Sequence, residues 1–264
     1  MKLDIETHLK VRLDRPTDIL LQIEAADIPE QRVVECSLDH SAGEHFARVP
    51  AQDMIGERIW LRAEGEVAID YTATIEPRRD LSPVPSLEAL PAHRLPGEVV
   101  PYLFDSRYCQ ADRFQAFVDA EFGGTSGGKR MEAICDWLSR KFAYVPGASG
   151  PHTTALDSFV ERRGVCRDYA HVTIAMARAS LIPARYVSLY GPEVDPQDFH
   201  AVAEVFLASD DGEGGEWQPV DATGMVEAAD MVKIGVGRDA ADVSFLTSFG
   251  QLQLVDKSVS VARA

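Results

Sequence analysis

The stretch Gly164-Val165-Cys166-Arg167-Asp168-Tyr169-Ala170-His171 places a cysteine after a glycine-led turn and at the start of an apolar helical run. The run continues to about Leu181, and Pro183 ends it. A helix N-terminus carries partial positive charge and free N–H groups, which favour the thiolate form of a cysteine. Cys166 is therefore a candidate nucleophile. Taken alone, its pattern favours a buried structural cysteine, and the later segments reverse that preference.

Two later segments supply the other residues that a cysteine nucleophile needs. Asp198-Phe199-His200-Ala201-Val202-Ala203-Glu204-Val205 begins a strand-like run, and Trp217-Gln218-Pro219-Val220-Asp221-Ala222-Thr223 begins another. A catalytic histidine must be held in one tautomer by a partner on its second ring nitrogen. If the two strands pair as a hairpin, their facing ends bring Asp221 to His200. Separately these are a capping histidine and a turn residue, but the order Cys166, His200, Asp221 is that of a nucleophilic triad.

These three segments resemble the sequence blocks of the transglutaminase-like superfamily, most closely its bacterial branch with an N-terminal β domain. The resemblance covers residues 100 to 264 and implies a papain-like core, in which the helix that carries the cysteine packs on an antiparallel sheet. It implies that Cys166 is the nucleophile, His200 the general base and acid, and Asp221 the group that orients the imidazole. Many relatives have Trp where this chain has Val202, a departure expected to affect the substrate channel or a lid.

Four further residues are candidates for supporting roles. Asp168 follows the helix start and is expected to cap free N–H groups there. An oxyanion hole needs a donor beside the Cys166 backbone N–H, and Tyr144 is the candidate. Trp217 is expected either to shield the triad from water or to pack in the core. His171 lies off the helical face of the cysteine and is expected to pack.

The chain divides into three parts by pattern. Residues 1–76 contain short alternating strands separated by turn residues, which predicts an all-β, sandwich-like domain. Residues 77–101 contain six prolines and predict an extended connecting segment. Residues 102–264 combine helical runs with strands and are expected to form the core. The predicted fold class is therefore α+β, a papain-like transglutaminase core preceded by an all-β sandwich-like domain.

Three other segments have weaker patterns. Residues 234–240 contain two glycines that echo a dinucleotide fingerprint, but no βαβ unit surrounds them, so a loop is predicted. Residues 210–215 predict a polar turn between the two strands that carry His200 and Asp221. Residues 251–261 alternate like a closing edge strand.

Composition narrows the class of partner. The chain has 26 Lys and Arg against 42 Asp and Glu, and its formal net charge of −16 argues against nucleic acid and against an anionic membrane surface. No run approaches the roughly 18 apolar residues of a membrane-spanning helix. Because residues 1–8 carry charges where a signal peptide needs apolar residues, a cytoplasmic location is expected.

The cysteine pattern gives no sign of a metal or cofactor. The four cysteines form no CxxC pair, there is no D-x-D-x-D-G calcium loop, and metal-independent activity without a cofactor is expected. The cysteines are Cys36, Cys109, Cys135 and Cys166.

The combined expectation is a cysteine-nucleophile acyl-transfer enzyme that acts on a peptide or amide through a thioester. A cysteine nucleophile predicts a thioester intermediate but not the molecule that attacks it. Peptidase, amidase and transglutaminase activity are therefore all possible, and hydrolysis is favoured because water is abundant. The alternative is a catalytically silent scaffold of the same fold that recruits a partner through residues 1–76. A redox-sensing cysteine is a third and weaker hypothesis, since no resolving cysteine is evident. The oligomeric state is left open.

Overall fold

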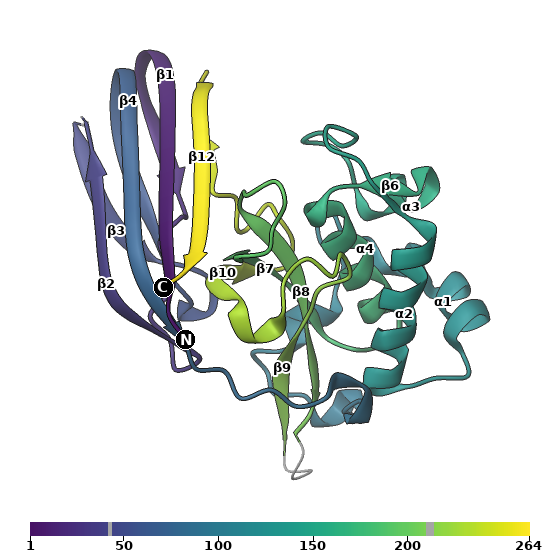
Figure 1. Ribbon diagram of the computed structural model, residues 1–264. Helices are drawn as coiled ribbons and strands as arrows, with labels where there is room; N and C mark the ends of the chain where they lie inside the picture. The colour runs from purple at the N-terminus through teal and green to yellow at the C-terminus, as the bar shows by residue number, and fades with distance from the viewer. Residues whose placement is uncertain (42–43, 210–213) are drawn as a thin grey trace.

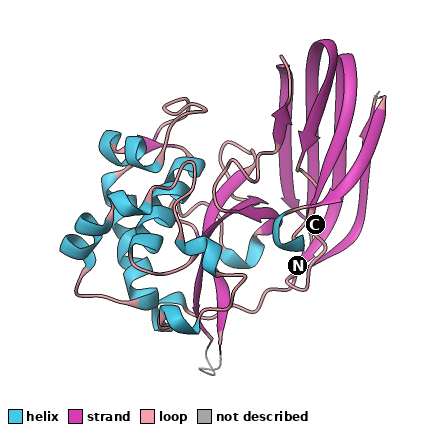
Figure 2. Cartoon of the chain, turned by 180° about the vertical axis from the view of Figure 1, so that it is seen from behind, coloured by secondary structure: helices cyan, strands magenta, loops and turns pink. Residues whose placement is uncertain are grey.

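The computed structural model describes residues 1–41, 44–209 and 214–264 (Figure 1). It contains a six-stranded and a four-stranded sheet, both antiparallel, and α-helices that lie beside the smaller sheet and away from the long strands of the larger one (Figure 2). This is the predicted α+β architecture. In the part of the chain that the structure describes, no helix is long and apolar enough to cross a membrane.

The larger sheet contains strands from both ends of the chain. Its order is β11-β1-β4-β2, with β12 also paired to β1 and β3 also paired to β4. These strands are β1 (Leu3–Leu21), β2 (Gln31–His40), β3 (His45–Pro50), β4 (Glu57–Pro77), β11 (Leu246–Ser248) and β12 (Gln253–Arg263).

Two long strands make this sheet sandwich-like. β1 pairs with β4 from Leu3↔Ile75 to Leu21↔Ile59, with a register shift between residues 13 and 17. Figure 1 shows both strands running to the end far from the termini, where they turn over. Alternate side chains of β1 are buried along both halves, and they share one apolar core. The alternating burial places the apolar side chains of both halves on the same face of the sheet. They pack against each other there, as in an all-β sandwich-like domain.

The C-terminal strand differs from the prediction. Residues 253–261 of the predicted segment do lie in an edge strand. However, β12 pairs with β1 in the larger sheet, whereas the sequence assigned residues 102–264 to one core unit. The two termini lie close together, and the Ala264 N–H donates to the Lys2 carbonyl. A period-2 pattern identifies a strand but not the sheet that it joins, because its partner is distant in sequence.

The proline-rich segment is packed and not freely extended. It contains three short 3-10 helices, and the carbonyls of Leu87 and Glu88 accept hydrogen bonds from Gly128 and Ala208. The segment therefore anchors to a helix and to a strand of the smaller sheet. The 3-10 helices among the described residues are Gln52–Met54, Val84–Ser86, Ala92–Arg94, Val100–Leu103, Ala111–Arg113 and Ala228–Asp230.

The smaller sheet has the order β10-β7-β8-β9, and α4 packs on β8 and β7. Its strands are β7 (Ala184–Tyr190), β8 (His200–Ala208), β9 (Gly215–Val220) and β10 (Val232–Gly237). The helices are α1 (Gln115–Phe122), α2 (Gly127–Lys141), α3 (Ala155–Glu161) and α4 (Cys166–Ala179), and a parallel pair of two-residue strands, β5 (Ala143–Tyr144) and β6 (Arg163–Gly164), precedes α4.

Two predictions concern this sheet. β8 and β9 pair antiparallel, which confirms the predicted hairpin, although residues 210–213 of the predicted turn lie outside the described residues. The loop predicted over residues 234–240 is wrong for residues 234–237, which belong to β10, the antiparallel partner of β7, whereas residues 238–240 lie outside any strand. The glycine at 235 serves close packing, since a Cβ there would lie 1.9 Å from the side chain of Gln22.

Candidate active site

Cys166 is the first residue of α4, and local packing fixes the turn before it. The Val165 N–H donates to Asp168 Oδ2 at 2.8 Å, so the fully buried Asp168 caps the helix start. A Cβ at Gly164 would lie 2.5 Å from Asp168 Cβ. Gly164 is therefore needed for the close approach of this carboxylate.

The hairpin of β8 and β9 brings His200 to Asp221. Their Nε2 and Oδ2 atoms are 3.0 Å apart, and both side chains are buried. The carboxylate also accepts from the N–H and hydroxyl of Thr223, at 2.8 and 2.6 Å, and from the N–H groups of Met225 and Val226, at 3.2 and 3.1 Å. Burial raises the pKa of Asp221, but the hydrogen bonds from His200 and Thr223 outweigh burial and lower it.

The imidazole and Cys166 line the same cavity. Burial lowers the pKa of His200, but its hydrogen bond to Asp221 and its interactions with the Cys166 thiol outweigh burial and raise the pKa to about 9. Nδ1 is buried and has no hydrogen bond of standard geometry among the described residues. Because Asp221 occupies Nε2, Nδ1 is the nitrogen left to exchange a proton with the thiol. Catalytic hydrogen bonds are often loose without substrate and tighten when it binds.

Tyr144 lies beside the cysteine, where β5 runs parallel to β6. Burial, followed by the charge of Cys166, raises the pKa of Tyr144 to about 12. The backbone and the thiol of Cys166 both lie close enough to influence the pKa of this hydroxyl. The structure thus places the tyrosine next to the backbone N–H that an oxyanion hole would use.

Trp217 is remote from this group. It lies opposite Phe206 in the hairpin, six residues along β8 from His200, which is roughly 20 Å at the usual rise of a strand. Its ring packs edge-on against Tyr102, with centroids 5.3 Å apart, and the Arg185 guanidinium lies 4.1 Å above it. The shielding role is therefore wrong, and the packing alternative describes this residue.

Two other singled-out residues are also part of the core. His171 is fully buried, stacks on the Tyr108 ring at 5.2 Å, and accepts the Ala240 N–H on Nε2. Burial and the charge of Arg167 lower the pKa of His171 to about 3, so it stays neutral. Val202 belongs to an apolar cluster of the smaller sheet, whereas the sequence assigned its effect to a channel or lid.

A cavity of about 480 Å³ opens beside Cys166 and His200. The Lys257 ammonium, on β12 of the larger sheet, forms an ion pair with Asp198 in its wall. Phe199 and Phe245 stack there with centroids 4.8 Å apart. Sequence reasoning missed Lys257 and Phe245, which carry no local signal of proximity to the site.

Sequence reasoning also did not single out Thr223, although it ends the segment quoted for Asp221. Its hydroxyl donates a hydrogen bond to Asp221 Oδ1 at 2.6 Å. Over residues 1–41, 44–209 and 214–264, no group of three or more His, Cys, Asp or Glu side chains is placed to hold a metal ion.

Comparisons with known proteins concern the family and the fold of the chain. The sequence profile of the Transglutaminase-like superfamily matches residues 117–222. An uncharacterised protein of Mycobacterium leprae is 37% identical over 118 residues, which cover 44% of this chain and 42% of that protein. An uncharacterised protein of Mycobacterium tuberculosis is 32% identical over 149 residues, 50% of this chain and 47% of that protein. The matches thus span less than half the length of these curated relatives.

One solved structure is similar along nearly the whole chain. It is a protein from Cytophaga hutchinsonii, named as a candidate cysteine protease, with a TM-score of 0.90 and 32% identity. The similarity covers 99% of this chain and 90% of that one, so it includes the larger sheet as well as the helical part.

Proposed function

This chain belongs to the transglutaminase-like superfamily, and we propose that it is a cysteine-dependent enzyme that cleaves or transfers at an amide bond through Cys166, His200 and Asp221. The observation that carries the proposal is the buried contact of 3.0 Å between His200 and Asp221, with Cys166 on the free side of the ring. A buried imidazole bound to a carboxylate on one nitrogen and facing a thiol with the other is the arrangement that cysteine nucleophiles need.

The proposed reaction begins from a thiolate–imidazolium pair, in which the proton of the Cys166 thiol rests on Nδ1 of His200, as the raised pKa of His200 favours. The sulfur attacks the carbonyl carbon of the amide. The resulting oxyanion is stabilised by the Cys166 N–H, with the Tyr144 hydroxyl as the second donor. Nδ1 then donates its proton to the leaving amine as the carbon–nitrogen bond breaks, which leaves a thioester on Cys166. Asp221 holds the ring and stabilises the imidazolium at each stage.

The second half of the reaction returns the enzyme to its first state. Water attacks the thioester and gives a carboxylic acid, or a primary amine attacks and gives a new amide. In both cases His200 accepts the proton of the attacking group and the sulfur leaves. We propose a peptide or amide substrate and hydrolysis as the main outcome. Water can enter an open cavity without a dedicated binding site, whereas an amine acceptor needs one.

The proposal is tested by labelling with an acylating probe that reacts with thiols, followed by mass spectrometry of the labelled peptide. We expect label on Cys166 in the wild type, no site-specific label in Cys166→Ala, and slow labelling of Cys166 in His200→Ala. Cys36→Ala is the matched control, because Cys36 is an exposed cysteine on β2. It should leave labelling of Cys166 unchanged.

The reverse result would favour the alternative scaffold. If Cys166 reacts no faster than the exposed Cys36 and is indifferent to His200, the triad is not functional. A screen of fluorogenic peptide amides, with and without added primary amine, then separates hydrolysis from transfer in an active protein.

A further inference from the structure

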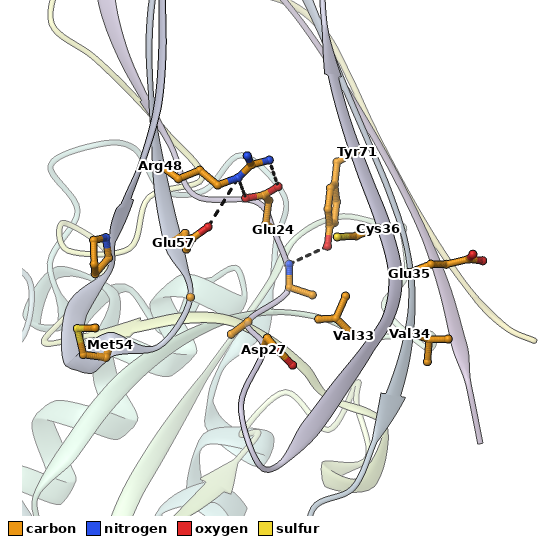
Figure 3. A pocket seen from close by; sticks show the side chains of 14 residues that line it. Glu24, Asp27, Val33, Val34, Glu35, Cys36, Arg48, Met54, Glu57 and Tyr71 are labelled. Carbon is orange, nitrogen blue, oxygen red and sulfur yellow. Dashed lines mark hydrogen bonds and ion pairs between the residues drawn. The ribbon is translucent and has the colours of Figure 1, made fainter.

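A second cavity, of about 630 Å³, lies in the sandwich-like domain between the edge strands β2 and β3 (Figure 3). Its floor is the chain at residues 24–27, which follows β1, and its walls are residues 33–36 of β2 and the end of β3 with the start of β4. Figure 3 shows the side chains of Cys36 and Tyr71 pointing into it from one wall. Its size lies within the usual range of ligand sites.

This cavity is separate from the one beside Cys166. The two share no lining residue. β12, which contributes Lys257 to the Cys166 cavity, pairs with one edge of β1, and β2 lies beyond β4 on the other side. The two cavities therefore open at opposite edges of the same sheet.

The cavity carries an excess of negative charge. Arg48 donates from Nε and Nη2 to Glu24, at 2.8 and 2.9 Å, and its Nε lies 3.7 Å from Glu57. Asp27 has no hydrogen-bond or ion-pair partner among the described residues. Four acidic residues, Glu24, Asp27, Glu35 and Glu57, thus line the cavity with one guanidinium, and Glu24 already occupies that guanidinium. A cationic group would be attracted to Asp27 and Glu57.

A buried hydroxyl supplies the second feature. Tyr71 is 1% exposed, and its hydroxyl accepts the Ala25 N–H at 2.9 Å. The proton of that hydroxyl has no acceptor in the described part of the chain, while the group itself points into the cavity (Figure 3). A buried donor without an acceptor is costly, so a ligand carbonyl at this point would be stabilised.

The walls also offer backbone groups and apolar surface. Within the described residues, β2 and β3 each pair as strands only with β4, apart from a single bridge between Gln31 and Ile28, which leaves most of their outer edges free to pair with another strand. Met54 and Val34, which are exposed, flank the opening. Methionine adapts to apolar side chains of different shapes.

We propose that this cavity binds an extended peptide segment with a lysine or arginine side chain. The backbone of the segment lies along the edge of β2 or β3, a carbonyl accepts the Tyr71 proton, and the cation lies between Asp27 and Glu57. Binding at this cavity does not involve Cys166.

The test measures the affinity for a fluorescein-labelled octapeptide of alternating Val and Lys by anisotropy, with a Val and Glu octapeptide as the reference. The protein is Cys166→Ala, which cannot process the probe. Asp27→Asn with Glu57→Gln should raise the Kd about 5-fold or more at physiological salt, where distant exposed charges are screened. Asp119→Asn with Glu132→Gln is the matched control, because it removes two exposed carboxylates from α1 and α2.

Cys36 gives a positional readout in the same protein. It is exposed and lines the cavity, whereas Cys109 is buried and Cys135 is half-buried. Bound Val and Lys peptide should slow alkylation of Cys36. If both double variants raise the Kd equally, the peptide is attracted to the acidic chain in general. If the peptide binds without protecting Cys36 from alkylation, it binds elsewhere. Either result overturns the proposal and leaves the triad proposal untouched, since that rests on labelling of Cys166.

Discussion

His200 Nε2 lies 3.0 Å from Asp221 Oδ2, and the carboxylate is itself held by four hydrogen bonds from the chain that follows it. Two of these bonds come from Thr223 and one each from Met225 and Val226. The loop after β9 therefore fixes the carboxylate, the carboxylate fixes the ring through Nε2, and Nδ1 stays without a hydrogen-bond partner among the described residues.

Asp221→Asn should keep the fold but weaken the activation of Cys166. The amide has the shape of the carboxylate but cannot stabilise an imidazolium, so we expect alkylation of Cys166 by iodoacetamide at pH 7 to slow about 10-fold or more. Intact-protein mass spectrometry gives the rate. Asp136→Asn, an exposed position on α2, is the control. An unchanged rate in Asp221→Asn would exclude a role for this carboxylate.

The raised pKa of His200 makes stability depend on pH. The folded protein holds this proton up to a pKa of about 9, against 6.5 for an ordinary histidine. The stabilisation is therefore complete below pH 6.5 and is lost as the pH rises towards 9. We expect the difference in unfolding free energy between wild type and His200→Gln to shrink by on the order of 2 to 3 kcal/mol between pH 6 and 9.5. Urea unfolding at several pH values measures it, and a difference that stays constant would contradict the ion pair.

Local sequence patterns predicted the parts of the site that are built from neighbouring segments. The helix that starts at Cys166 follows from a glycine-led turn and an apolar run. The hairpin that joins His200 to Asp221 follows from two alternating segments with a polar turn between them. Both depend on contacts that are short in sequence, where period and turn residues carry most of the information.

The parts that sequence did not predict depend on distant contacts. Lys257 enters the cavity wall because β12 pairs with β1, which is more than 240 residues away. Trp217 was placed at the triad because it shares a segment with Asp221, but the strand between them carries it to the far end of the hairpin. Gly235 has the pattern of a loop, yet its missing side chain makes room for Gln22 in a packed strand.

Gly164→Ala should destabilise the start of α4. The added Cβ would lie 2.5 Å from Asp168 Cβ and 2.7 Å from Asp168 Oδ2, so the cap on Val165 has to move. We expect a loss of about 1 to 3 kcal/mol in the free energy of unfolding. Gly124→Ala is the control, because a Cβ at Gly124 meets nothing within 4 Å. Equal stability of the two variants would show that Asp168 can shift at no cost.

The last prediction concerns Glu204, a buried carboxylate on β8 between two cations. Its oxygens lie 2.7 Å from Arg185 Nη2 and 2.6 Å from Lys233 Nζ. Burial raises the pKa of Glu204, but the charges of Lys233 and Arg185 outweigh burial and lower it to about 2. The stabilisation is therefore present above the ordinary value of 4.5 and is lost as the pH falls towards 2.

Glu204→Gln removes the buried charge that both cations share. It leaves each cation with one partner that is less buried, Glu30 for Lys233 and Asp53 for Arg185. We expect a loss of about 3 kcal/mol at pH 7. Urea unfolding should show that this loss shrinks towards pH 3, because the wild-type carboxylate is then closer to protonation. Glu66→Gln is the matched control, since Glu66 pairs with Lys10 and Arg12 in an exposed position, where solvent already screens the charges. It should cost much less at either pH. If the two variants lose the same stability, the buried cluster contributes no more than a surface pair, and the low pKa of Glu204 has no consequence for folding.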